Sequence, residues 1–279
     1  MRNLVRVLNH KGKKGDVIRI PTPTRGSASA KVVEAQVTLQ AHGTDTGVVV
    51  TINQHFEYSR LIEDFADVQA LESLRRFYTD DAGYALGTQV DIDLIIGILG
   101  GTIVFSSSTI QSTSTLPTMY EGDGTVWDEA GTTDITDAGI RAMMLVLDNN
   151  DVPFADRYFV VPTIVKSDLL GLARFTEQAF VGEVAGANSI RNGLIGNVYN
   201  MPVFVSTNLP LVDDSTGGAD NKLGLMFQRD AQVLVEQVGV RAQTQYKQEY
   251  LATLFTADTI YGEQQLRSTA VVPFVVPST

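Results

Sequence analysis

The feature that most constrains the fold of this chain is a polar stretch at residues 22–47, between two segments of strand-like sequence. Apolar residues alternate with polar ones over residues 15–24 and again over 48–56, the two-residue period of a β-strand. We therefore interpret residues 16–55 as one long β-hairpin. Its outer part is rich in Ser, Thr, Ala and Gly, and its large aliphatic residues are only Val32, Val33, Val37 and Leu39.

The length of this hairpin predicts that it projects from the rest of the chain. An arm of roughly fifteen residues reaches about 50 Å at the usual strand rise. A compact domain of this size is only about 40 Å across. A two-stranded ribbon is marginal in water, so a projecting one needs support from outside its own domain. The alternative is a disordered loop of about 25 residues.

The charge of the chain is distributed unevenly along the sequence. Residues 1–31 contain eight Lys and Arg against one acidic residue, a net of +7. The other 248 residues contain thirteen basic and thirty-one acidic residues, a net of −18. A basic terminus can bind nucleic acid, can lie on the acidic body of another copy, or can be solvated without a partner. Charge alone does not decide between these three interpretations.

The remaining pattern predicts a mixed α+β chain. From Ile62 the apolar period becomes helical and continues to Gly100-Gly101, which indicates one long helix or two in tandem. Residues 102–131 lack periodicity and are expected to form a surface excursion containing Trp127. Further on we expect helices at 136–149, 163–175, 229–235 and up to about 260, strands at 157–161, 202–207, 223–227, 238–250 and 264–276, and loops at 176–192 and 211–222.

The residue types give no foundation for catalysis. Cysteine is absent, which excludes disulfides, thiolate chemistry and the usual structural zinc sites. Of the three histidines, His10 and His42 lie in the arm and hairpin region, where nothing encloses them, and are expected at the surface. His55 follows a strand and is expected closer to packed structure, but its neighbour Glu57 is not enough for a site. Nucleotide-binding and hydrolase motifs do not occur. We expect no catalytic, cofactor or metal site, the alternative being a hydrolase that uses one of the acidic pairs. The sequence contains no run of about 18 apolar residues, the length that would predict a membrane span.

Six segments in order resemble the major capsid protein of tailed bacteriophages. They read GDVIRIP, VVVTINQHFEYSRLIEDFADVQA, YTDDAGYALGTQVDIDLI, RYFVVPTIVKSDLL, IRNGLIGNVYNMPVFVSTNLP and TIYGEQQLR. The resemblance covers nearly the whole chain and implies the α+β fold called Hong Kong 97 (HK97). It implies an N-terminal arm at 1–15, an extended loop at 16–55, a peripheral domain with a spine helix at 56–133 and 251–279, and an axial domain at 134–250. Family members usually have a longer arm, so an upstream segment is expected.

The resemblance also implies a function. Copies of the chain would assemble in the host cytoplasm, as pentamers and hexamers, into an icosahedral shell of the virion. Portal, scaffolding and decoration or cement proteins would be partners, and double-stranded DNA would be enclosed without sequence-specific binding. The alternatives are an encapsulin-type compartment of the same fold and a nucleic-acid-binding module that uses residues 1–31. The expected contacts between subunits come from the hairpin: Arg19, Arg25, Lys31, Val33, Val37 and Leu39.

Overall fold

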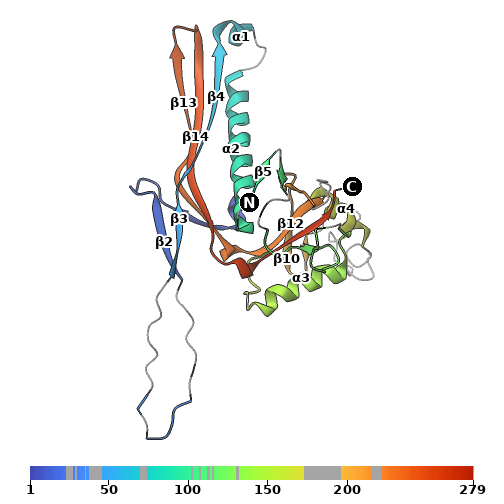
Figure 1. Cartoon of the computed structure of the whole chain (residues 1–279). Helices are drawn as coiled ribbons and strands as arrows, with labels where there is room; N and C mark the ends of the chain where they lie inside the picture. Colours follow the sequence, from blue (N-terminus) through green and yellow to red (C-terminus); the bar gives the residue numbers. More distant parts are fainter. Residues whose placement is uncertain are drawn as a thin grey trace, which may run out of the picture.

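The strands in the described part of the chain form two sheets and a separate two-stranded ribbon, and one long helix runs along both sheets (Figure 1). The structure is a computed structural model. It describes residues 1–22, 28, 30–34, 36–37, 46–69, 74–101, 103–106, 108–111, 114, 116–129, 132–172, 196–214 and 221–278.

The first sheet is a long, narrow blade of four strands. Its order is β1 (Arg6–Asn9), β13 (Gln232–Lys247), β14 (Ala252–Gln265) and β4 (Gln54–Glu63). Strands β13, β14 and β4 are antiparallel neighbours, whereas β1 lies parallel to the first residues of β13. Figure 1 shows that the outer half of the blade extends well beyond the second sheet.

Two of the predicted helices are wrong because their residues belong to this blade. The helix expected up to about residue 260 is strand β14, in which Phe255, Ala257, Thr259 and Tyr261 are buried at every second position. This two-residue period governs the segment although its Leu and Ala content is typical of a helix. The helix expected at 229–235 is reduced to the 3-10 turn η2 (Arg229–Ala231), after which β13 begins.

The long helical pattern is two helices in tandem, α1 (Asp64–Gln69) and α2 (Leu74–Leu99). The predicted start at Ile62 is wrong, since this residue is buried in strand β4. Helix α2 ends where Gly100 and Gly101 adopt positive φ angles of 67° and 78°, the left-handed conformation that glycine allows at a helix end. By length and composition alone α2 could cross a membrane, but its buried residues (Ala82, Leu86, Leu94, Ile95, Ile98 and Leu99) pack on the two sheets.

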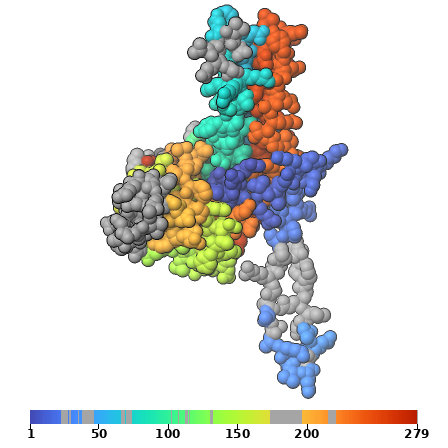
Figure 2. Space-filling view, turned by 180° about the vertical axis from the view of Figure 1, so that it is seen from behind, coloured from blue at the N-terminus to red at the C-terminus, as the bar shows by residue number. Residues whose placement is uncertain are grey.

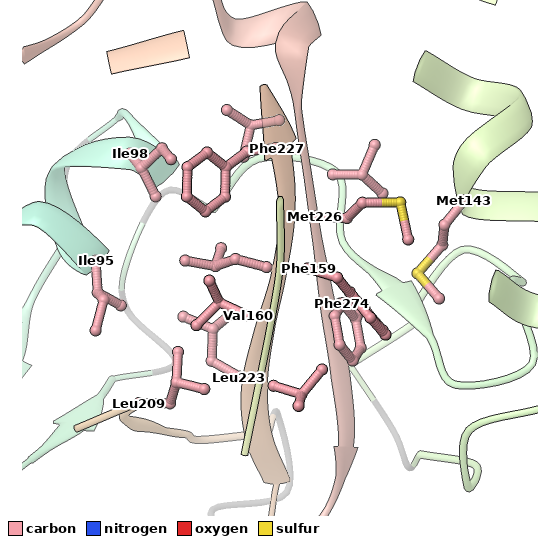
Figure 3. Packing of buried hydrophobic residues seen from close by; sticks show 14 of the residues in the cluster. Ile95, Ile98, Met143, Phe159, Val160, Leu209, Leu223, Met226, Phe227 and Phe274 are labelled. Carbon is pink, nitrogen blue, oxygen red and sulfur yellow. The ribbon is translucent and has the colours of Figure 1, made fainter. Parts of the chain in front are cut away.

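The second sheet has nine strands and holds most of the core. Strands β8, β12 and β15 are buried nearly throughout, as expected of strands covered on both faces. Figure 3 shows Phe159 and Phe274 in the layer between Ile95 of α2 and Met143 of α3 (Asp137–Asn149). The strands are β5 (Phe105–Ser106), β6 (Thr109–Ile110), β7 (Tyr120–Glu121), β8 (Arg157–Val161), β9 (Asn197–Val198), β10 (Met201–Val205), β11 (Leu211–Val212), β12 (Asn221–Gln228) and β15 (Val271–Pro277).

Loops predicted from polar composition differ in part from the structure. The segment 102–131 provides β5, β6 and β7, and it buries Ile110, Met119 and Trp127 in the core. The ends of the predicted loop at 211–222 are the strands β11 and β12. The helix predicted at 163–175 is α4 (Thr163–Gly171), and residues 173–175 and the loop predicted at 176–192 lie outside the described residues.

The sheets also divide the chain at different points from the predicted domains. The predicted boundary at residue 250 falls in the turn between β13 and β14, which form one antiparallel ladder. The last strand, β15, which the prediction assigns to the peripheral domain, pairs with β12 in the nine-stranded sheet. The sequence could not reveal this, because either sheet can accept a short apolar strand. The domain assignment itself stays a prediction.

Candidate subunit interface

The two-stranded ribbon is the base of the predicted hairpin. Strand β2 (Val17–Thr22) is antiparallel to β3 (Thr46–Thr51), with Val17 opposite Thr51 and Thr22 opposite Thr46. In Figures 1 and 2 this ribbon leaves the side of the four-stranded sheet and stands clear of the nine-stranded one. The two predicted strands therefore pair with each other. The outer part of the hairpin, mostly outside the described residues, stays a prediction.

A small apolar core of its own anchors the ribbon to the blade. Val50 and Ile52 of the hairpin are buried against Val233 and Val235 of β13, with Ile18 packed beside them. Because side chains alternate along a strand, these residues lie on the face of the sheet opposite α2. The hairpin therefore starts from a packed base.

Gly262 of β14 permits this close packing. A Cβ atom at this residue would lie 2.3 Å from the carbonyl oxygen of Thr51 and 2.8 Å from the Cα of Ile52. Such distances are far shorter than a van der Waals contact, so only glycine leaves room for the hairpin strand to cross β14 here. The backbone N–H of Ile52 donates to the carbonyl of Asp16 at 2.7 Å and closes the base.

The basic residues of the N-terminal segment are partly used within the chain itself. Arg2 donates to both carboxylate oxygens of Glu236, and Lys11 Nζ lies 3.8 Å from the same carboxylate. The hydrogen bond to Glu236 raises the pKa of Arg2. Gln237 Nε2 donates to the carbonyls of Lys13 and Gly15, at 3.2 and 3.0 Å. The segment predicted as an arm is thus tied along β13 of its own subunit, and less of its charge is left for a partner.

The predicted contact residues that the structure describes are all exposed. Arg19 points outward from β2, and Lys31 is exposed beyond the ribbon. The side chains of Val33 and Val37 are 86% and 62% exposed. Arg25 and Leu39 lie outside the described residues. Apolar side chains this exposed are consistent with a contact to another molecule, and their role in one stays a prediction.

A groove beside α2 was not predicted from the sequence. It has a volume of about 550 Å³ and lies between α2, β13 and the N-terminal segment. Gly83 and Gly87 leave one side of the helix bare, since a Cβ at either residue would meet no atom within 4 Å. Tyr84 and Val240 on the groove are 72% and 58% exposed. The four-residue spacing of the glycines, which places them on one helix face, was the available signal.

Some polar groups of the blade pair with each other at its surface. Asp258 on β14 accepts hydrogen bonds from Arg241 at 2.7 and 2.8 Å, and this interaction lowers its pKa. His55 is exposed, although it was expected closer to packed structure, and lies 3.4 Å from the same carboxylate. His42 is outside the described residues. Within the described part of the chain, no three His, Asp or Glu side chains are grouped as metal ligands.

Solved structures that are similar to this chain include phage capsids. One from Mycobacterium phage Che8 is 24% identical and has a TM-score of 0.68, covering 94% of this chain and 85% of that one. The capsid of cyanophage P-SCSP1u is 19% identical with a TM-score of 0.72, covering 99% and 87%. The capsid of Ralstonia phage GP4 is 13% identical with a TM-score of 0.71, covering 99% and 87%. These similarities define the fold as the HK97-like capsid fold.

The family follows from the sequence itself. A family model described as phage capsid protein matches residues 44–261, more than three quarters of the 279 residues. The chain belongs to this phage capsid protein family. No curated protein sequence gave a match.

This membership confirms the predicted fold class and the predicted function. The chain is a major capsid protein, a structural protein that builds the shell of a phage particle. The encapsulin alternative is not favoured, because the family and the similar structures are phage capsids. Its location is the capsid of the virion.

Proposed function

We propose that the subunits assemble by laying the outer hairpin of one copy along the groove beside α2 of the next copy. The observation that carries this proposal is the exposure of Val33 and Val37, which have no packing partner among the described residues of their own chain. The groove has complementary properties. Its glycines leave space for a backbone to approach α2, and Tyr84 and Val240 offer apolar surface.

Charge contributes orientation and partner choice to this contact. Arg19 and Lys31 remain exposed, whereas residues 32–279 are strongly acidic. Basic groups on a projecting hairpin are attracted to the acidic body of a neighbour, while the two bodies repel each other. Hairpin-to-body docking is therefore favoured over body-to-body docking, and the preference weakens as salt screens the charges.

The finer organisation follows the family. We propose pentamers and hexamers in an icosahedral shell, assembled in the host cytoplasm with scaffolding and portal proteins and with decoration or cement proteins. The acidic body disfavours tight binding to phosphate, so enclosed double-stranded DNA is confined without sequence readout. We further propose that the domains follow the sheets, with β1, β4, α2, β13 and β14 peripheral and the nine-stranded sheet axial. The role is structural, with no catalytic step.

A hairpin replacement tests this proposal. Thr22 and Thr46 are opposite each other, so an Asn-Gly pair in place of residues 23–45 closes β2 and β3 with a two-residue turn. The small core at Val50 and Ile52 is untouched, and we expect a folded, soluble subunit that forms no shells in electron microscopy. The double variant Val33→Ser and Val37→Ser is the milder counterpart, expected to reduce shell yield. Normal shells from the Asn-Gly variant would refute the proposed docking.

A further inference from the structure

Three chain connections between the two sheets pass through one place, which we call the crossing. Helix α2 ends there and leads to β5, the turn η2 leads from β12 to β13, and the turn η3 (Ser268–Ala270) leads from β14 to β15. The backbone N–H groups of Leu266 and Arg267 both donate to the carbonyl of Ala231, at 2.7 and 3.2 Å. Any change in the angle between the sheets must act on these connections.

Alternate residues of β14 present polar groups to α2 at the crossing. The hydroxyl of Tyr261 donates to Asp93 Oδ2, and Gln265 Nε2 donates to the carbonyl of Ile98 at 2.7 Å. Farther out, the same helix and strand meet through apolar residues such as Leu86 and Phe255. The contact between α2 and the blade is thus apolar at its outer part and polar at the crossing.

Glu263 lies between these two polar contacts and rests on the helix backbone. A Cβ atom at Gly97 would lie 1.7 Å from Oε2 of Glu263 and 2.3 Å from its Cδ, so only glycine admits the carboxyl group. Gln232, the first residue of β13, donates from Nε2 to Oε2 at 2.5 Å. Gln232 is fully buried, and its Oε1 has no hydrogen-bond partner among the described residues.

The surroundings of Glu263 disfavour a negative charge. Helix α2 contributes Asp93, β14 contributes Tyr261, and β13 contributes only the neutral Gln232. No cation in the described part of the chain forms an ion pair with Glu263. Burial, and then repulsion by Asp93, raise the pKa of Glu263 to about 8. Burial also raises the pKa of Asp93.

We propose that Glu263 works as a neutral carboxylic acid that locks β14 onto the end of α2, and that loss of its proton loosens the crossing between the two sheets. Protons have a route to the group, because Glu263 lines an open cavity of about 290 Å³ with Gly97, Gly100 and Gln265. The lock lies within one subunit, so the inference does not depend on how the hairpin docks.

The direction of the pH effect follows from proton binding. Between the ordinary value of 4.5 and about 8, the folded subunit keeps the Glu263 proton while the unfolded chain has released it. The folded state therefore binds more protons in this window, and its stability falls as pH rises through it. The contribution is complete below about 4.5 and is lost above about 8. The crossing is tightest in mild acid and loosest in alkali.

The test uses the full chain with Glu263→Gln, which keeps a neutral group at every pH. Hydrogen exchange of amides 93–101, corrected for intrinsic rates, is measured from pH 5 to pH 9, together with thermal unfolding. In the wild type we expect protection to fall by about tenfold or more across this range. In Glu263→Gln this fall in protection between pH 5 and pH 9 should be absent. The exposed Glu57→Gln on β4 is the matched control and should keep the wild-type dependence.

Two outcomes would overturn the inference. One is an identical pH dependence in the wild type and Glu263→Gln. The other is an equal loss of the dependence in Glu57→Gln. A second variant, Asp93→Asn, removes the neighbouring charge and should move the midpoint of the transition to lower pH. An unmoved midpoint in a folded Asp93→Asn subunit would contradict the role of the pair even if Glu263→Gln fails to fold.

Discussion

Alanine at two glycines of α2 should change the stability of the subunit in opposite directions. At Gly87 an added Cβ meets no atom within 4 Å, and alanine is favoured over glycine inside a helix by about 0.8–1 kcal/mol. We expect Gly87→Ala to raise the free energy of unfolding by up to about 1 kcal/mol. At Gly97 the same added atom would lie 1.7 Å from Oε2 of Glu263, so the glutamate side chain has to swing away.

That movement has a cost that the structure lets us assess. It breaks the 2.5 Å hydrogen bond from Gln232, whose buried amide then has no partner at either polar atom among the residues that the structure describes. A buried unsatisfied polar group costs about 1–3 kcal/mol. The helix preference for alanine offsets about 1 kcal/mol of this. We therefore expect Gly97→Ala to lower the free energy of unfolding by about 1 kcal/mol, opposite in sign to Gly87→Ala.

Urea unfolding of the full chain at pH 7, followed by circular dichroism, measures both effects. The urea dependence of the free energy should be unchanged, so that the midpoint alone reports stability. In a Glu263→Ala background the obstructing carboxyl is gone, and Gly97→Ala should then stabilise as Gly87→Ala does. If Gly97→Ala stabilises the otherwise unmodified chain as much as Gly87→Ala, the contact between Glu263 and α2 is refuted. Persistent destabilisation in the Glu263→Ala background would also refute the reasoning.

Two further variants test the proposed docking of the hairpin. The double variant Arg19→Glu and Lys31→Glu should lower the yield of shells, measured by light scattering, most strongly at low salt. Arg229 is an exposed basic residue elsewhere, so the control Arg229→Glu should have little effect. Equal yields from the double variant and the wild type at all salt concentrations would show that the charge of the hairpin is incidental. Gly87→Trp should fill the groove beside α2 and block shell formation while the subunit stays folded. The control Gly87→Ala should still assemble. Normal particles from the tryptophan variant in electron microscopy would exclude the groove as the docking site of the hairpin.

Local sequence signals predicted the elements that depend on neighbouring residues. The helix expected at 136–149 begins at Asp137, and the hydroxyl of Thr136, its N-cap, accepts from the N–H of Gly139 at 3.0 Å. Strand β8 has the predicted bounds, 157–161. The glycine pair after α2 ends the helix as expected. In each case the signal lies within a few residues of the element, which is why a single sequence is sufficient.

Elements that depend on distant residues could not be predicted in the same way. Strand β14 has helix-forming residues, and its strand conformation comes from pairing with β13 on one side and β4 on the other. The ion pairs of Arg2 and Lys11 depend on Glu236, more than two hundred positions away. For the same reason the sequence did not indicate that part of the basic head is engaged within its own subunit.

The candidate interface was predicted only in its outline. The low content of large apolar residues predicted where the hairpin lies, and Val33 and Val37 in it are exposed. The groove was missed, because only the structure shows that Gly83 and Gly87 face open space. The contact between Glu263 and Gly97 was missed as well, since residues so far apart in the sequence give no combined signal. In both cases the role of a glycine depends on what faces it in the folded chain, and that part of the chain is distant in the sequence.

The anchorage of the hairpin determines how mechanical load enters the subunit. A pull on the hairpin tip runs lengthwise through β2 and β3, so it does not peel their ladder apart, and it arrives at the small core around Val50 and Ile52. That core presses on Gly262, whose neighbour in β14 is Glu263 on the opposite face of the sheet. Tension from outside and the protonation of one carboxyl therefore act on adjacent residues of a single strand. In a shell assembled in the proposed way, the hairpin contact between subunits would transmit load to residues next to the proposed flexible connection between the two sheets.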